Sequence, residues 1–301
     1  MAVSLACRGL RVSDPAASAH FYEGLGFRRV EAGGDPVVDP ERGAPDGVLL
    51  RNGHGVTLHL VRLPAPGRRD LRRRRPMTAL GLTHLNFYVR DFAATLDAVR
   101  ARGGAVAEET LISVASGGGR TSMIYCVDPD GIRVEIWSTE PYGVGGFSSA
   151  IPGIDHKFSH SGICVRDLRE SISFYEALGF VPAETFDYRD PPGQLDRMFE
   201  EVDSRAVAQM MRNGNDVIEL LAFLHPQPRR DRGWDGSADP GFCRLVFNAA
   251  SLNDIPGSAI GPGVAEAARR HVCSRSPTLI RGADPNGVTI EFIVDGRDAG
   301  G

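Results

Sequence analysis

The sequence has little that would place the protein in a membrane, in an oxidising compartment or on a nucleic acid. No run of ~18 apolar residues occurs along its 301 residues, so no segment is expected to span a bilayer. Its 5 cysteines are odd in number and show no Cys-x-x-Cys spacing, which favours reduced thiols over a disulfide framework. The net charge of only −4 gives no general attraction to nucleic acid or to anionic membranes.

The N-terminal residues up to Cys7 resemble a lipoprotein signal, but they lack a basic start and a long apolar region. Cys7 also falls on a repeated position described below, so we do not interpret this segment as a signal. We therefore expect a cytoplasmic protein, monomeric or homodimeric, whose partner is a small-molecule substrate.

Two motifs occur twice in the chain. Residues 21–27 (FYEGLGF) match residues 174–180 (FYEALGF), 153 positions later. Residues 128–135 (DPDGIRVE) match residues 284–291 (DPNGVTIE), 156 positions later. Two matches at nearly one offset indicate a duplicated half-chain.

Each half divides again into two modules. Three predicted strands each lead to an aspartate that can cap the following helix: Asp14, Asp91 and Asp167. Seven residues before these aspartates lie, in turn, Cys7, His84 and His160, and a weaker fourth start places Cys243 in the corresponding strand. The four starts are 77, 76 and 83 residues apart, which predicts four modules in the order A-B-A′-B′.

The second module shows the pattern most fully. Residues 82–91 read as a half-buried strand, residues 92–102 as an amphipathic helix ended by two glycines, and residues 125–137 as a hairpin. Because side chains alternate along a strand, His84 shares a face with Asn86 and Tyr88. The same rule puts Glu135 on one face of the last strand.

These motifs resemble the vicinal oxygen chelate superfamily, which includes glyoxalase I, methylmalonyl-CoA epimerase, extradiol dioxygenases and bleomycin-resistance proteins. The resemblance rests on the opening at residues 160–180 and the Asp-Pro-Asp-Gly-x-x-x-Glu close at residues 128–135. It implies an α+β fold of four βαβββ modules that pair into two cupped mixed β-sheets. It does not fix the reaction, since this family supports many chemistries on one scaffold.

The domain boundaries follow from composition. We expect one domain at residues 1–140 (modules 1 and 2), a second at residues 155–295 (modules 3 and 4), and a flexible tail at residues 296–301. An arginine-rich segment, residues 63–76, is interpreted as a solvated linker rather than a phosphate-binding arm, because no aromatic or glycine-rich partner accompanies it. An insertion at residues 186–199 is either a lid over a cavity or a surface loop.

Each module offers one residue on its first strand and one on its last that point into its cup. In chain order these pairs are Cys7 and His59, His84 and Glu135, His160 and Glu219, and Cys243 and Glu291. A His paired with a Glu at matching positions of two modules favours a divalent metal over isolated surface histidines. The assignment of His59 needs a one-residue gap in the preceding turn.

The modules can pair in two ways. Consecutive pairing, 1 with 2 and 3 with 4, mixes cysteine, histidine and glutamate in both cups. Pairing 2 with 3 and 1 with 4 collects His84, Glu135, His160 and Glu219 in one cup, the two-His, two-Glu set that bacterial-type glyoxalase I enzymes use. That resemblance implies one intact metal site, and a second cup that has degenerated to Cys7, His59, Cys243 and Glu291. We favour this second pairing.

The function expected from this site is that of a metal-dependent lyase or isomerase of the glyoxalase or epimerase type. One divalent ion (Ni²⁺, Co²⁺, Mn²⁺, Fe²⁺ or Zn²⁺) would stabilise an enediolate of a small oxygenated substrate, with Glu135 or Glu219 as the base. An extradiol dioxygenase, with His84, His160 and Glu135 on iron, is the alternative enzyme. A metal-free binding protein of the bleomycin-resistance kind is the non-enzymatic alternative.

Overall fold

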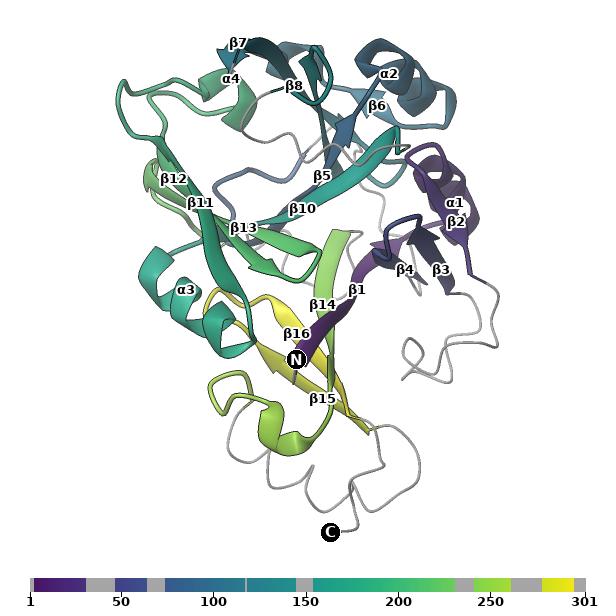
Figure 1. Ribbon diagram of the computed structural model, residues 1–301, viewed down its shortest axis with the longest axis vertical. Helices are drawn as coiled ribbons and strands as arrows, with labels where there is room; N and C mark the ends of the chain where they lie inside the picture. Colours follow the sequence, from purple (N-terminus) through teal and green to yellow (C-terminus); the bar gives the residue numbers. More distant parts are fainter. Residues whose placement is uncertain are drawn as a thin grey trace.

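The computed structural model describes residues 3–30, 47–63, 74–116, 118–144, 154–230, 241–260 and 278–294 (Figure 1). It confirms an α+β fold built on two mixed sheets, with few helices. Among the described helices, none is long and apolar enough to cross a membrane. The tail predicted at residues 296–301 lies outside the described residues.

The elements follow the predicted modular order. Module 1 consists of β1 (Val3–Val12), α1 (Pro15–Glu23), β2 (Phe27–Arg29), β3 (Val48–Asn52) and β4 (Thr57–Arg62). Module 2 consists of β5 (Gly81–Val89), α2 (Phe92–Ala101), β6 (Ala105–Val106), η1 (Glu108–Thr110), β7 (Ile112–Ser116), β8 (Gly119–Val127) and β9 (Arg133–Glu140).

The second half of the chain repeats this order. Module 3 consists of β10 (His156–Val165), α3 (Leu168–Ala177), β11 (Val181–Tyr188), α4 (Asp196–Phe199), β12 (Arg205–Asn213) and β13 (Asp216–His225). The described part of module 4 consists of β14 (Gly241–Ala249), η2 (Leu252–Asp254), β15 (Thr278–Ala283) and β16 (Thr289–Val294). Module 1 is therefore a complete βαβββ unit; module 2 adds one strand and the short helix η1 to this pattern, and module 3 adds the short helix α4.

The two sheets settle which modules pair. One sheet has the order β11-β12-β13-β10-β5-β9-β8-β6, with β7 added beside β8, and the other has the order β15-β16-β14-β1-β4-β3-β2. We call them the 2–3 sheet and the 1–4 sheet after the modules that form them. In each sheet the two modules meet through their first strands, β5 with β10 and β1 with β14, both antiparallel (Figure 1). The favoured pairing of modules is thus confirmed.

Each sheet contains strands from both halves of the chain, so the halves are interleaved. The division into domains at residues 1–140 and 155–295 stays a prediction.

The two repeated motifs contact each other. The hydroxyl of Tyr22, in the first Phe-Tyr-Glu motif, donates to Asp128 Oδ2 at 3.0 Å, and Tyr175 donates to Asp284 Oδ2 at 3.1 Å. Both tyrosines are fully buried. The helix of each odd-numbered module is therefore fixed to the last hairpin of the module that follows it, which explains why both motifs occur together in each half.

The sheets pack through two large apolar cores. One joins α1 and α2 to the 1–4 and 2–3 sheets, and the other does the same around α3. Between the sheets lies Arg8, 1% exposed, whose Nη2 is 2.7 Å from Asp216 Oδ1 and whose Nε donates to Ser161 Oγ at 3.1 Å. Its guanidinium also stacks over the ring of Phe158. This buried cation ties β1 of one sheet to β10 and β13 of the other.

The end of the arginine-rich segment is not the solvated linker that its composition predicts. Arg74 forms ion pairs with Glu200 and Glu109, and Arg75 donates to the carbonyl groups of Leu80 and Leu82. Residues 64–73 of that segment lie outside the described residues.

The insertion at residues 186–199 packs on module 2. Met198 and Phe199 of α4 are buried in an apolar cluster that includes Tyr125 of β8, and Arg197 Nε donates to the carbonyl of Glu109 at 3.1 Å. The insertion is therefore not a free surface loop, while a lid over a cavity stays a prediction.

Candidate metal centre

The four residues predicted to share a cup lie together on one face of the 2–3 sheet. We call them the 2–3 cluster: His84 (β5), Glu135 (β9), His160 (β10) and Glu219 (β13). Strand register brings them there, because Gly162 of β10 is opposite His84 on one side and Glu219 on the other. On β5, Asn86 is opposite both His160 and Glu135.

The donor atoms of the 2–3 cluster converge. The Nε2 atoms of His84 and His160 lie 3.3 Å apart. His84 Nε2 is 3.2 Å from Glu135 Oε2 and 3.7 Å from Glu219 Oε2, and His160 Nε2 is 3.9 Å from each of these oxygens. Ligands of one ion with bonds of about 2.0–2.2 Å lie roughly 3–4 Å apart. The spacing of His84, Glu135 and His160 therefore fits a single divalent ion, with Glu219 Oε2 close to both imidazoles.

Neighbouring side chains orient the ligands. The hydroxyl of Thr83 lies 3.0 Å from His84 Nδ1, and that of Ser159 lies 3.2 Å from His160 Nδ1. Each imidazole is thus held at Nδ1 while its Nε2 faces the cluster, as is usual for metal-binding histidines. Asn86 donates from Nδ2 to Glu135 Oε2 at 2.6 Å and accepts from Trp137 Nε1 at 2.6 Å, which fixes the carboxylate.

Burial sets the charge of the cluster. It lowers the pKa of His160 to about 3, and the adjacent His84 adds to this effect, so His160 is neutral. It raises the pKa of Glu219 to about 7, with Glu135 contributing. Burial alone would also raise the pKa of Glu135, but the hydrogen bond and charge of His84, with smaller effects of His160 and Asn86, hold that pKa below its usual value.

The two carboxylates lack an obvious counter-ion. Within the described ranges, no lysine or arginine lies within ion-pair distance of Glu135 or Glu219, and their partners are the two imidazoles. Two buried carboxylates without a lysine or arginine partner are costly unless a cation joins them. The donor set, two nitrogens and two oxygens, suits the transition metals listed above.

The corresponding positions of the 1–4 sheet hold a different set. We call it the 1–4 cluster: Cys7 (β1), His59 (β4), Arg244 (β14) and Glu291 (β16). The prediction that Cys243 occupies the β14 position is wrong by one residue. Gly9 of β1 is opposite Arg244, as Gly162 is opposite His84, so Arg244 corresponds to His84 and Cys243 to Thr83.

The other members of the 1–4 cluster are confirmed by register. His59 of β4 is opposite Gly9, as Glu219 is opposite Gly162. Cys7 of β1 and Glu291 of β16 are both opposite Val246 of β14. His160 and Glu135 are both opposite Asn86 of β5, so Cys7 corresponds to His160 and Glu291 to Glu135.

Arg244 supplies a fixed positive charge to this second cluster. Its Nε is 3.2 Å from Glu291 Oε2, and its Nη2 is 3.1 Å from His59 Nδ1. Arg281 Nε pairs with the other carboxylate oxygen of Glu291 at 2.8 Å. A guanidinium therefore occupies the place where a cation would be bound in the 2–3 cluster.

Glycine is required at the positions opposite His84 and Arg244. A Cβ at Gly162 would lie 2.1 Å from His84 Cε1, and one at Gly9 would lie 2.4 Å from Arg244 Cγ. In each sheet the glycine lets a neighbouring side chain cross the strand into the cluster. No sequence motif singled out these glycines, although each lies two residues after a cluster position.

Comparison with known proteins agrees with this duplicated architecture. The family model described as Glyoxalase/Bleomycin resistance protein/Dioxygenase superfamily matches residues 4–136 and 157–292. The chain belongs to this superfamily. Its resemblance to the vicinal oxygen chelate proteins is thereby confirmed for the family and the fold, while the reaction is not fixed by it.

Solved structures of this superfamily include whole-chain matches. Two glyoxalase I mutants from Zea mays are similar, with TM-scores of 0.63 and 0.62 at 15% and 14% identity. These matches cover 98% and 97% of this chain and 93% and 94% of the maize chains. No curated protein matches by sequence. At this identity the similarity establishes the glyoxalase-like fold alone.

Proposed function

We propose that this protein is a metal-dependent enzyme with one active site per chain, formed by the 2–3 cluster. It would act as a lyase or isomerase on a small oxygenated substrate. The observation that carries the proposal is the convergence of donor atoms on the two imidazoles: Nε2 of His84 and Nε2 of His160 lie 3.3 Å apart, and each lies 3.2–3.9 Å from a carboxylate oxygen of Glu135 and of Glu219. Among the described residues, no lysine or arginine balances the two carboxylates.

The ligands have separable roles. Neutral His160 and its neighbour His84 would bind a divalent cation through Nε2, and Glu135 would bind it while held by Asn86. The bound cation would supply Lewis acidity towards adjacent oxygen atoms of the substrate.

Glu219 is the better candidate for the base. Its carboxylate makes only the longer contacts, 3.7 and 3.9 Å, to the two imidazoles, and no hydrogen bond to it is found in the described part of the chain. A carboxylate this lightly held can turn towards a substrate carbon and take a proton next to a carbonyl group. Glu135, restrained by Asn86 and His84, would remain in place.

The surroundings favour a substrate with an apolar part. The ring of Tyr125 lies 5.7 Å from that of His84, and Tyr125 belongs to an apolar cluster with Leu221 of β13 and with Met198 and Phe199 of α4. The inserted helix thus covers apolar surface next to the donor atoms, where it would exclude water from a bound substrate.

Metal analysis of the purified protein tests the proposal. We expect about one divalent ion per chain, and its loss in His84→Ala and, separately, in His160→Ala, although these residues belong to different halves. Cys7→Ala and Cys243→Ala are the matched controls and should retain the ion. A protein without bound metal, or a His160→Ala variant that keeps it fully, would overturn the assignment.

One observation supports a second candidate. The tightest group of potential ligands is His84, Glu135 and His160, whose donor atoms all lie within 4.8 Å of one another. Two histidines and one carboxylate are the ligand set of many non-haem Fe²⁺ oxygenases. Oxygen uptake with catechols by the iron-loaded protein distinguishes this extradiol dioxygenase from the lyase or isomerase. A metal-free binding protein fits less well, because its cup would be lined by apolar groups rather than by four ionisable ones.

A further inference from the structure

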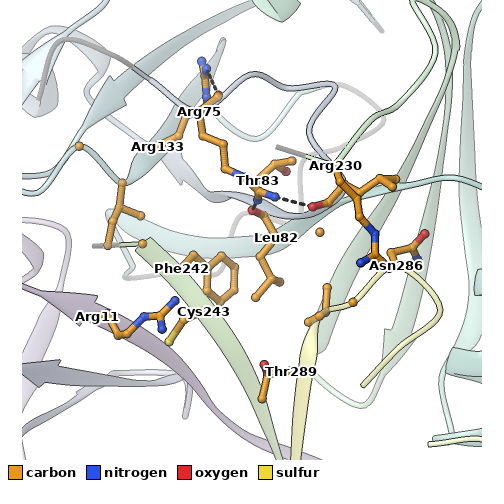
Figure 2. Close-up of a pocket in the computed structure, with 17 residues that line it drawn as sticks. Arg11, Arg75, Leu82, Thr83, Arg133, Arg230, Phe242, Cys243, Asn286 and Thr289 are labelled. Atoms are coloured by element: carbon orange, nitrogen blue, oxygen red, sulfur yellow. Dashed lines mark hydrogen bonds between the residues drawn. The ribbon is translucent and has the colours of Figure 1, made fainter. Parts of the chain in front are cut away.

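A polar cavity of about 190 Å³, separate from the 2–3 cluster, lies where the two sheets meet. We call it the seam pocket. Its walls come from the first residues of β5 and β14 and from the two Asp-Pro-x-Gly turns that precede β9 and β16 (Figure 2). Strand register relates these walls in pairs: Thr83 corresponds to Cys243, and Arg133 to Thr289. The pocket therefore lies across the internal two-fold relation of the chain and exists because of the duplication.

The seam pocket is strongly basic. Four arginines line it, Arg11, Arg75, Arg133 and Arg230, and none of the described residues that line it is acidic. Two of these arginines are fixed in its wall: Arg133, 3% exposed, donates to the carbonyl of Arg75 at 2.9 Å and pairs with Glu200 at 2.7 Å, while Arg75 donates to backbone carbonyls.

The other two arginines lack a countercharge. Arg11 and Arg230 approach from opposite sides in Figure 2, beside Cys243 and Asn286 respectively. Neither forms an ion pair with any carboxylate in the described part of the chain, and the Nε atom of Arg11 is buried without a hydrogen-bond partner there. A buried guanidinium nitrogen without a partner, as at Arg11 Nε, is costly unless an anion joins it, and the exposed Arg230 adds a second positive charge at the same cavity.

We propose that the seam pocket binds a small oxyanion of the phosphate type. Guanidinium groups match the oxygen geometry of phosphate through paired N–H donors. The hydroxyl of Thr289 adds a neutral polar group to the same wall. The cavity has the volume of roughly six water molecules and is smaller than a pocket for a drug-sized ligand, so it suits inorganic phosphate, pyrophosphate or the phosphate end of a small ester.

The site is distinct from the 2–3 cluster, none of whose four residues lines it. The two are nevertheless neighbours, since Thr83 lines the pocket and also contacts His84 Nδ1 at 3.0 Å.

Calorimetric titration of the full chain with pyrophosphate at low ionic strength tests the proposal. We expect one binding event per chain, weakened at least ~10-fold by Arg11→Gln/Arg230→Gln, because each substitution removes a charged hydrogen-bond donor. The matched control, Arg28→Gln/Arg169→Gln, removes two exposed arginines elsewhere and should leave the affinity within ~2-fold of the parent value. Equal weakening in both double variants, or absence of binding to the parent, would overturn the proposal.

Two further measurements separate the remaining explanations. Pyrophosphate should bind the His160→Ala variant as it binds the parent; loss of binding there would place the anion at the 2–3 cluster instead. If the double variant fails to fold, Arg230→Gln alone tests the same site, because this side chain is exposed and its removal leaves the core intact. Inorganic phosphate and a phosphate monoester, titrated in parallel, distinguish a free anion from an esterified one by which binds more tightly.

Discussion

The described 1–4 sheet repeats the order of seven strands of the 2–3 sheet, with matching register at the two clusters, yet the sheets meet the cost of a buried glutamate in different ways. In the 2–3 cluster, Glu135 and Glu219 are next to two imidazoles and have no arginine or lysine partner among the described residues. In the 1–4 cluster, Glu291 pairs with Arg244, which belongs to the chain itself. Under the proposed function, one scaffold would hold an exchangeable cation in one sheet and a permanent one in the other, with Arg244 at the position that corresponds to His84.

The most demanding test of this difference is to convert the 1–4 cluster into a copy of the 2–3 cluster. Cys7→His/Arg244→His removes the internal cation and provides imidazoles beside His59 and Glu291. The expected outcome is a rise from about one to about two divalent ions per chain, measured by elemental analysis. Cys7→His alone keeps Arg244 and serves as the control, which should stay near one. An unchanged stoichiometry in the double variant would show that more than ligand identity separates the clusters.

Removing the internal cation without replacing it should destabilise the fold. Arg244→Ala leaves Glu291, 2% exposed, with only the exposed Arg281 as a partner, and we expect a loss of about 3 kcal/mol in the free energy of unfolding. Arg281→Ala should cost no more than about 1 kcal/mol, because that guanidinium is largely solvated. Urea denaturation of both variants measures the two values. A similar cost for both would contradict the role given to Arg244.

The residue that holds a ligand in the 2–3 cluster can also be replaced by its counterpart in the 1–4 sheet. Asn86 holds Glu135, whereas the corresponding Val246 cannot hold Glu291. Asn86→Val should therefore weaken metal binding about 10–100-fold, the usual effect of losing a partner of a ligand. Competition with a chromogenic chelator gives the affinity. Asn86→Asp, which keeps the shape but adds charge, should not restore it, and parental affinity in Asn86→Val would remove Asn86 from the site.

The last expected effect concerns the pH dependence of the free energy of unfolding. Burial, together with Asp130, raises the pKa of Asp128 from 3.8 to about 7. The folded state therefore holds this proton more tightly than the unfolded chain, and the stabilisation from the raised pKa is complete below about pH 4 and is lost as the pH rises through 7. Asp128 contributes a fall of up to ~1.4 kcal/mol per pH unit in this window. Asp128→Asn, which can retain the contact with Tyr22, should flatten that slope in urea denaturation series, and an unaltered slope would exclude Asp128 as its source.

Much of this architecture could be predicted from the sequence, because repetition reveals equivalent positions without any knowledge of contacts. The spacing of His84 and His160 from their capping aspartates identified both imidazoles, and the Asp-Pro-x-Gly turns located Glu135 and Glu291. The pairing of modules could also be predicted, since only one arrangement collects like ligands.

What sequence could not supply was register in the least regular module. Cys243 was placed from the weaker fourth start at residues 242–248, and in the described part of module 4 the element that follows β14 is the short η2 rather than an α-helix. The alternation of Leu245 and Phe247, which match Leu85 and Phe87, would have placed Arg244 beside Glu291. The seam pocket was beyond sequence reasoning altogether, since its four arginines come from separate segments that only the packing of two sheets brings together.

The pairing of first strands also has a consequence for the order of folding. β1 at the start of the chain pairs with β14, more than 230 residues later, while β5 pairs with β10 across about 75 residues. During synthesis from the N-terminus, the 2–3 sheet can therefore close while β1 still presents an unpaired edge. That edge, left open until the last module emerges, is where a second nascent copy could exchange β14 with the first. Intertwined dimers formed at high expression levels would be its signature.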